Sequence, residues 1–153
     1  MPTQYAGAVE ESELYSYALS ALAARDLPEA QLRNKLAKKG AASDVERVVQ
    51  KLKAKKFLDD NRYAENFAKY SSAKWGRHKI RMELKKKGVA ESIIEKALAA
   101  LESESSPVDE AFSLLERYRT RYQGAKPKAI RFLVGRGFSI AEALEAWDRL
   151  SKG

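Results

Sequence analysis

Apolar residues recur along this chain in steps of three and four, the spacing that places them on one face of an α-helix. No segment alternates apolar and polar residues with a period of two, so the pattern predicts an all-α protein without strands. We expect nine helices, in three groups of three. The stripes of the first group are Leu14, Ala18 and Leu22, then Leu32 and Leu36, then Val45, Val48, Val49 and Leu52.

The second and third groups follow the same plan. In the second group the stripes are Tyr63, Phe67 and Tyr70, then Ile80 and Leu84, then Ile94, Ala97, Leu98 and Leu101. In the third group they are Ala111, Leu115 and Tyr118, then Ile130, Leu133 and Val134, then Leu144, Trp147 and Leu150. We expect these residues, Trp147 included, to form the cores of three successive units.

One short phrase occurs in the middle of each group and makes the chain an array of repeats. The copies read LRNKLAKKG, IRMELKKKG and AIRFLVGRG, and their last glycines, Gly40, Gly88 and Gly137, lie 48 and 49 residues apart. A period of this size indicates a helical repeat protein. The predicted organisation is a flexible N-terminus over residues 1–11, followed by three-helix repeats over 12–58, 59–103 and 104–153.

Glycine and polar residues mark the predicted helix ends. Each repeated glycine is expected to end its helix in the left-handed conformation, where the missing Cβ removes a steric penalty. Side chains with an oxygen at the right offset predict the N-terminal caps. These candidates are Asp59, Asp60 and Asn61, then Ser106 with Pro107 and Asp109, then the capping box of Ser139 with Glu142.

The net charge of +8 lies mostly in the middle of the chain. Residues 1–30 carry a net −4, residues 31–96 a net +11, and residues 97–153 a net +1. A positive field attracts DNA, RNA or an acidic protein surface. The alternative is that these are lysines solvated on the outer faces of helices.

Composition also limits the compartment and the chemistry. Cysteine is absent, which excludes disulfides and thiolate chemistry. The N-terminus lacks the basic start and apolar core of a signal peptide, and no stretch reaches the ~18 apolar residues of a membrane span. We therefore expect a cytoplasmic protein that does not bind a membrane.

The sequence carries no pattern typical of a catalytic site. His78 is the only histidine, so a metal cluster would depend on carboxylates alone. There is no phosphate-binding loop, nucleophile elbow or H-E-x-x-H motif. We expect no enzymatic activity, no catalytic or metal-binding residues and no cofactor, and we interpret the Asp59–Asp60 pair as a helix cap.

The second repeat carries a diagnostic phrase. It reads LDDNRYA over residues 58–64 and GRHKIRMELKKKG over residues 76–88. This phrase resembles the central signature of the RecX family of bacterial recombination regulators, and the resemblance extends over nearly the whole chain. Two features depart from the family pattern. Arg77 stands where the family usually has proline, and the segment before Gly76 is one residue shorter.

The resemblance implies both a fold and a function. The implied fold is three tandem three-helix repeats in an elongated, curved, solenoid-like array. The implied partner is the filament of the recombinase RecA on single-stranded DNA, whose ATPase, strand-exchange and co-protease activities the protein would inhibit. We expect it to act as a monomer, with weak, salt-dependent affinity for single-stranded DNA.

The candidate contact residues are basic. They are Arg33, Lys74, Arg77, Lys79, Arg81, Lys85, Lys86 and Arg131. Steps of four place Arg77, Arg81 and Lys85 on one helical face, which predicts an exposed basic stripe. Guanidinium groups in such a row can make bidentate contacts with carboxylate or phosphate. The alternative is that their stems pack along the helices and their charged heads are merely solvated.

Two further interpretations are open. Trp75 can stack on a base, anchor a partner's pocket or pack between units. The whole chain can also be a nucleic-acid-binding module, because three-helix units resemble helix-turn-helix domains. The third helix of each repeat would then read DNA. In the second and third repeats that helix carries acids such as Glu91, Glu95 and Glu145, which argues against sequence-specific binding to duplex DNA.

Overall fold

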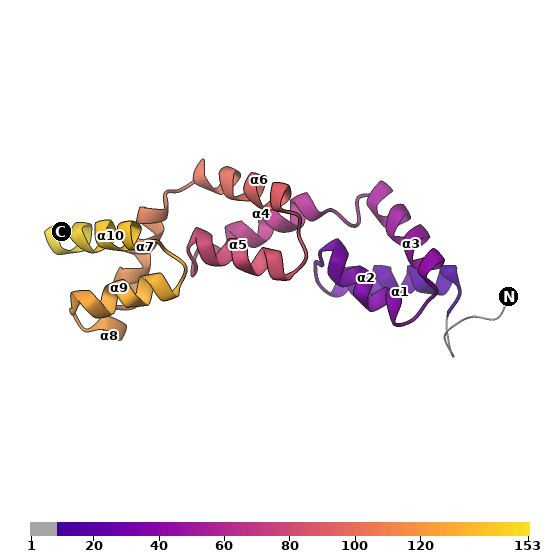
Figure 1. The fold of residues 1–153 in the computed structure, drawn as a ribbon, viewed down its shortest axis with the longest axis horizontal. Helices are drawn as coiled ribbons and strands as arrows, with labels where there is room; N and C mark the ends of the chain where they lie inside the picture. The colour runs from indigo at the N-terminus through magenta and orange to yellow at the C-terminus, as the bar shows by residue number, and fades with distance from the viewer. Residues whose placement is uncertain (1–8) are drawn as a thin grey trace. The chain divides into compact units, whose positions relative to one another are not determined.

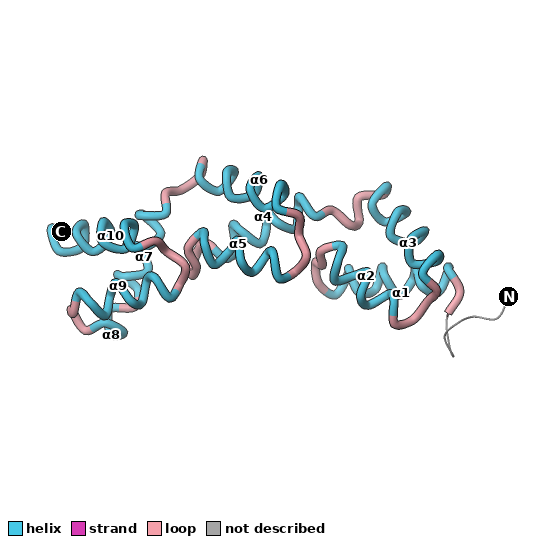
Figure 2. The backbone as a smooth tube through the Cα atoms, in the orientation of Figure 1, coloured by secondary structure: helices cyan, strands magenta, loops and turns pink. Residues whose placement is uncertain are grey.

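The computed structural model describes residues 9–153, and within them the chain forms ten α-helices and no strand (Figures 1 and 2). The helices are α1 (Glu11–Ala24), α2 (Glu29–Ala37), α3 (Ala42–Ala54), α4 (Asp60–Ser71), α5 (Arg77–Lys86), α6 (Glu91–Glu102), α7 (Pro107–Arg117), α8 (Arg119–Tyr122), α9 (Lys126–Gly135) and α10 (Ile140–Lys152). The predicted all-α class is confirmed. Residues 1–8, most of the segment predicted to be flexible, lie outside the described residues.

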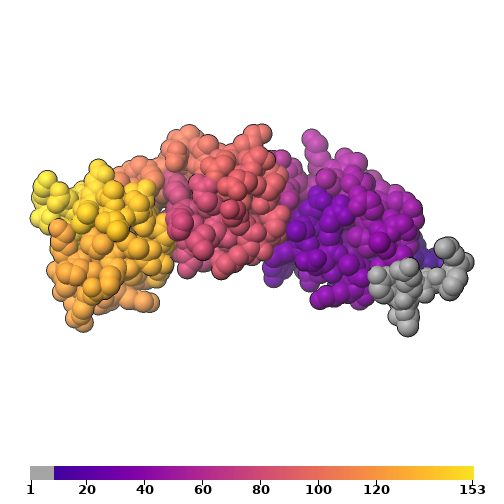
Figure 3. Space-filling view, viewed as in Figure 1, coloured from indigo at the N-terminus to yellow at the C-terminus, as the bar shows by residue number. Residues whose placement is uncertain are grey.

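The helices form two compact units, whose atoms are drawn as spheres in Figure 3. The described part of the first unit is residues 9–63 together with Lys87–Val89, and the second unit is Ala64–Lys86 with Ala90–Gly153. The first unit therefore ends within the first turn of α4.

The core of the first unit matches the predicted stripes. Leu32 and Leu36 of α2 are fully buried, because their spacing of four places both on the face that packs against α1 and α3. The rest of this core comprises Leu14, Ala18, Leu27, Val45, Val48, Val49, Leu52 and Leu58. Leu22 is partly buried against it.

In the second unit, three residues predicted to lie in the core are exposed, so the prediction is wrong for them. Tyr70 is 77% exposed, Val134 42% and Leu144 41%. In α9 and α10 the buried positions belong to Leu133 and to small residues, Ala129, Ala143 and Ala146. Alanine at these positions lets the helices approach closely, which turns the larger neighbouring side chains towards solvent. Trp147, predicted to be core, is partly buried against this cluster.

The helix α8 is one more than the nine predicted. Tyr118, expected to continue the stripe of α7, instead has φ −112° and ψ 38° and ends that helix. The next four residues form α8, which ends where Gln123 has φ 48°. The hydroxyl of Tyr122 donates a hydrogen bond of 2.7 Å to the carbonyl oxygen of Leu115, which fixes α8 against α7.

Two of the three repeated glycines have the predicted left-handed conformation. Gly88 has φ +84° and Gly137 has φ +101°, so a side chain at either position would be strained. For Gly40 the prediction is wrong, because its φ is not positive. That glycine instead lies close to a side chain of the core, since a Cβ atom there would lie 2.8 Å from Cδ2 of Leu14, which would have to shift.

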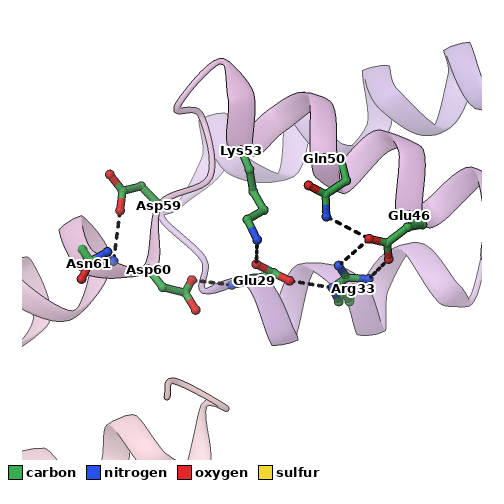
Figure 4. A network of polar contacts seen from close by, with 8 residues as sticks. All are labelled: Glu29, Arg33, Glu46, Gln50, Lys53, Asp59, Asp60 and Asn61. Atoms are coloured by element: carbon green, nitrogen blue, oxygen red, sulfur yellow. Dashed lines mark hydrogen bonds and ion pairs between the residues drawn. The ribbon is translucent and has the colours of Figure 1, made fainter. Parts of the chain in front are cut away.

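The predicted capping residues do not all cap the helix that they precede. Ser106 caps α7 and the Ser139–Glu142 box caps α10, as predicted. Asp59 accepts hydrogen bonds from the backbone N–H groups at the start of α4. Asp60 acts elsewhere: it accepts a hydrogen bond of 2.8 Å from the backbone N–H of Glu29, at the start of α2 (Figure 4). Burial raises the pKa of the Asp60 carboxyl.

A contact between two glycines positions the start of α5 in the second unit. The N–H of Gly76 donates a hydrogen bond of 2.8 Å to the carbonyl oxygen of Arg136. A Cβ atom at Gly76 would lie 2.5 Å from the carbonyl carbon of Gly137, and one at Gly137 would lie 2.4 Å from Cβ of Lys79. The first turn of α5 is therefore held directly on the turn between α9 and α10.

Candidate partner-binding surface

Arg33, the candidate in the first unit, lies within an ion-pair network (Figure 4). Its Nε is 2.8 Å from a carboxylate oxygen of Glu29, and its Nη1 is 2.7 Å from one of Glu46. Nζ of Lys53 completes the network at 3.1 Å from Glu29. The guanidinium of Arg33 is thus already paired with two carboxylates.

We expect the ion pairs of this network to change how the Glu46 carboxyl titrates. Hydrogen bonds from Arg33, and then from Gln50, lower the pKa of the Glu46 carboxyl from 4.5 to about 2. A lowered pKa in the folded state means that the interaction is complete above pH 4.5 and is lost as the pH falls towards 2. In an Arg33→Leu variant the pKa should return towards 4.5, as measured by the carboxyl carbon shift of Glu46 in an NMR titration. An unchanged titration curve would contradict this ion pair.

Arg77 is not part of an exposed stripe, contrary to our prediction. Its side chain is only 11% exposed and forms an ion pair with Glu110 of α7, which is 10% exposed. Its Nη2 also donates a hydrogen bond of 2.9 Å to the carbonyl oxygen of Ser105. Arg77 therefore ties the start of α5 to the start of α7, a structural role that proline could not perform.

Three further cations of α5 also form ion pairs within the second unit. Arg81 forms an ion pair with Glu95. Nζ of Lys85 is 3.3 Å from a carboxylate oxygen of Glu91, and Nζ of Lys86 is 3.1 Å from one of Glu83. Acids of α6 thus cancel much of the positive charge that the sequence of α5 suggests.

Lys74 and Lys79 have a different environment, because both lie over an aromatic ring. Each Nζ is 4.8 Å from the centroid of the Trp75 ring, and that of Lys74 is also 5.6 Å from the centroid of Tyr70. The Trp75 ring packs against Phe67, with centroids 6.2 Å apart. Trp75 is partly buried, so it both packs within its unit and holds two ammonium groups.

Three arginines that our sequence analysis did not select surround Tyr118. The guanidinium carbons of Arg117, Arg121 and Arg136 lie 5.9, 6.0 and 5.2 Å from the centroid of that ring. Arg136 also lies 5.0 Å from the ring of Phe132. The alternation of basic and aromatic residues in RYRTRY, over 117–122, is the signal that could have identified this group.

Two hydrogen bonds join this group to Lys74 and Trp75. Nη1 of Arg136 donates to the carbonyl oxygen of Lys74 at 3.3 Å, and Nη1 of Arg117 donates to that of Ala73 at 3.2 Å. The last candidate, Arg131, is exposed on α9. The structure therefore brings Lys74 and Lys79 together with arginines from α7, α8 and the end of α9.

Metal-binding clusters and membrane-spanning helices are both absent from the described residues. Between residues 9 and 153, no three histidine, aspartate or glutamate side chains gather closely enough to hold a metal ion. In the same part of the chain, no helix has the length and apolar character needed to cross a membrane.

Tandem three-helix units with basic surfaces define a class of helical-repeat protein, and comparison with known proteins gives the family. The model of the first three-helix domain of RecX matches residues 15–52, and the model of the second matches residues 59–98. The chain belongs to the RecX family. The predicted relationship is confirmed.

Individual relatives agree with this assignment. The chain is 39% identical over 136 residues to the regulatory protein RecX of a strain of Thermus thermophilus, covering 89% of this chain and 91% of the relative. It is 33% identical over 144 residues to that of Clostridium acetobutylicum, covering 87% and 67%. The family is therefore one of regulatory proteins.

Solved structures share the fold. The crystal structure of RecX from Lactobacillus salivarius has a TM-score of 0.81 at 23% identity and covers 94% of this chain and 97% of its own. A second crystal structure, of a regulatory protein RecX, has a TM-score of 0.77 at 25% identity and covers 90% and 71%.

Proposed function

We propose that this protein is a regulator without catalytic activity, which binds the RecA filament on single-stranded DNA and inhibits its ATPase, strand-exchange and co-protease activities. The observation that carries the proposal is the match of both three-helix domain models, together with a relative aligned over nine-tenths of its length. The protein would act in the cytoplasm, as a monomer and without a cofactor.

Repeated units suit this function physically. A filament presents the same protomer many times, and linked contacts to successive protomers add avidity without any single strong contact. Among the predicted contact residues, we assign this role to Lys74, Lys79 and Arg131, which have no carboxylate partner within the described residues. Arg33, Arg77, Arg81, Lys85 and Lys86 are engaged in ion pairs, so contact through them would require exchange of partners.

The proposal predicts inhibition without chemistry. When the protein is titrated into homologous RecA on single-stranded DNA, ATP turnover and strand exchange should both fall, because bound protein obstructs the filament. The protein alone should hydrolyse no ATP. A coupled ATPase assay measures the turnover. As a control, the coupling enzymes are given ADP directly, and their rate must not change when the protein is added. A filament that neither binds the protein nor slows in its presence would refute the proposal.

The second candidate function is nucleic-acid binding that does not require the recombinase. The unneutralised cations around Trp75 and Tyr118 favour it. Such binding would be salt-dependent and is compatible with regulation of a filament that holds DNA.

A further inference from the structure

Two groups of cations in the second unit have opposite electrostatic environments. Four cations of α5 face carboxylates of their own unit, among them Arg77 with Glu110 and Arg81 with Glu95. By contrast, one group has no carboxylate partner within residues 9–153 and lies against aromatic rings instead. Its members are Lys74, Lys79, Arg117, Arg121 and Arg136. With Trp75 and Tyr118 they form what we call the Trp75–Tyr118 surface.

The basic groups of this surface are held in place. Lys74 and Lys79 share one indole ring, each 4.8 Å from its centroid. The guanidinium of Arg136 lies close to two rings, at 5.2 Å from Tyr118 and 5.0 Å from Phe132. An aromatic face attracts a cation without neutralising its charge. The positive charges are therefore oriented in advance and remain available to an anion.

The anion that fits this arrangement carries both charge and flat rings. Five cations linked by short contacts suit successive phosphates, and partly exposed aromatic side chains beside them offer faces for bases. Tyr70, whose ring lies 5.6 Å from Nζ of Lys74, is 77% exposed and extends the aromatic area. In a duplex the bases are stacked on each other, so an aromatic–basic surface of this kind favours a single strand.

We propose that the Trp75–Tyr118 surface binds the phosphates and bases of single-stranded nucleic acid. The inference extends the proposed function, because it assigns the contact with single-stranded DNA to a particular surface. It can nevertheless be tested with bare DNA, so its failure is distinguishable from failure of recombinase inhibition.

The test compares two triple variants with the same change of charge. The first is Lys74→Gln, Lys79→Gln and Arg121→Gln, which leaves the backbone hydrogen bonds of Arg117 and Arg136 intact. The matched control is Arg81→Gln, Lys85→Gln and Lys86→Gln, which removes two lysines and one arginine that are ion-paired on α5. Circular dichroism verifies that both variants keep their helices.

Binding is measured by fluorescence anisotropy with a labelled 30-mer of dT over a range of salt concentrations. The first variant should bind on the order of tenfold more weakly, and its salt dependence should flatten by about 2 in log–log slope, ~0.7 for each phosphate that is no longer neutralised. The control variant should change binding by less than about twofold, because its cations are already neutralised. Equal reductions of affinity in the two variants would overturn the inference.

A second measurement reports on Trp75 directly. The chain has two tryptophans, so a Trp147→Phe variant leaves Trp75 as the only indole. Saturating dT should quench or shift its emission, and a duplex of the same length should do so less. Unchanged emission at saturation would overturn base contact at this site. If the first triple variant lost only recombinase inhibition while dT binding was unchanged, the surface would be a protein contact and the inference would be wrong.

Discussion

The variant Glu110→Leu is expected to destabilise the second unit by about 3–5 kcal/mol, because it leaves the Arg77 guanidinium buried without its counter-charge. The two side chains are only 11% and 10% exposed, so water cannot replace the missing carboxylate. The hydrogen bond from Arg77 to the carbonyl oxygen of Ser105 compensates only part of the charge. Urea denaturation followed by circular dichroism at 222 nm measures the decrease in stability.

The double variant Arg77→Met with Glu110→Leu is the control for this result. Nε of Arg77 and Oε2 of Glu110 have no hydrogen-bond partner, so the pair is incompletely satisfied. Replacing both charges by apolar side chains of similar size should therefore restore the stability of the parent or exceed it. If the single and double variants were equally unstable, packing rather than buried charge would explain the effect.

The variant Leu84→Ala should cost roughly 2–5 kcal/mol, because it opens a cavity under α5. Leu84 is fully buried, and it repeats the position of Leu36 in the first unit. Met82 provides the matched control on the same helix: it is 46% exposed, so Met82→Ala should change stability by about 0.5 kcal/mol or less. The same urea titration measures both. If Leu84→Ala were as stable as the parent, α5 would not be part of the core.

Periodicity predicted the helices well and the buried faces less well. Leu32 with Leu36 and Ile80 with Leu84 are fully buried, because a spacing of four on a short helix defines one face. In α10 the apolar residues extend over a wider arc. Leu144 gave as good a helical pattern as Ala143, and only the close approach of α7 decides that alanine is buried. Composition alone cannot make that distinction.

In the candidate site, the sequence alone likewise could not show which basic residues are neutralised. The basic residues of α5 were visible in the sequence, but their partners Glu95 and Glu110 lie 14 and 33 residues away from Arg81 and Arg77. Only the fold shows that these charges are neutralised. Lys74 and Lys79 stay predicted contact residues, and the structure places both over the Trp75 ring. The local pattern RYRTRY marks Arg117 and Arg121, whereas Arg136 joins this group only through tertiary contacts.

Because Asp60 caps α2, the first sequence repeat does not contain all the residues that its own helices need. A fragment ending at Leu58 would contain all three helices of the first repeat but would lack the acceptor for the N–H of Glu29. It would also lack Gly88, where a Cβ atom would lie 2.5 Å from that of Ala30. A chimaera that exchanges first repeats between relatives should therefore take its crossover after Tyr63 and keep residues 87–89 from the same parent, so that the contacts of Asp60 and Gly88 come from one sequence.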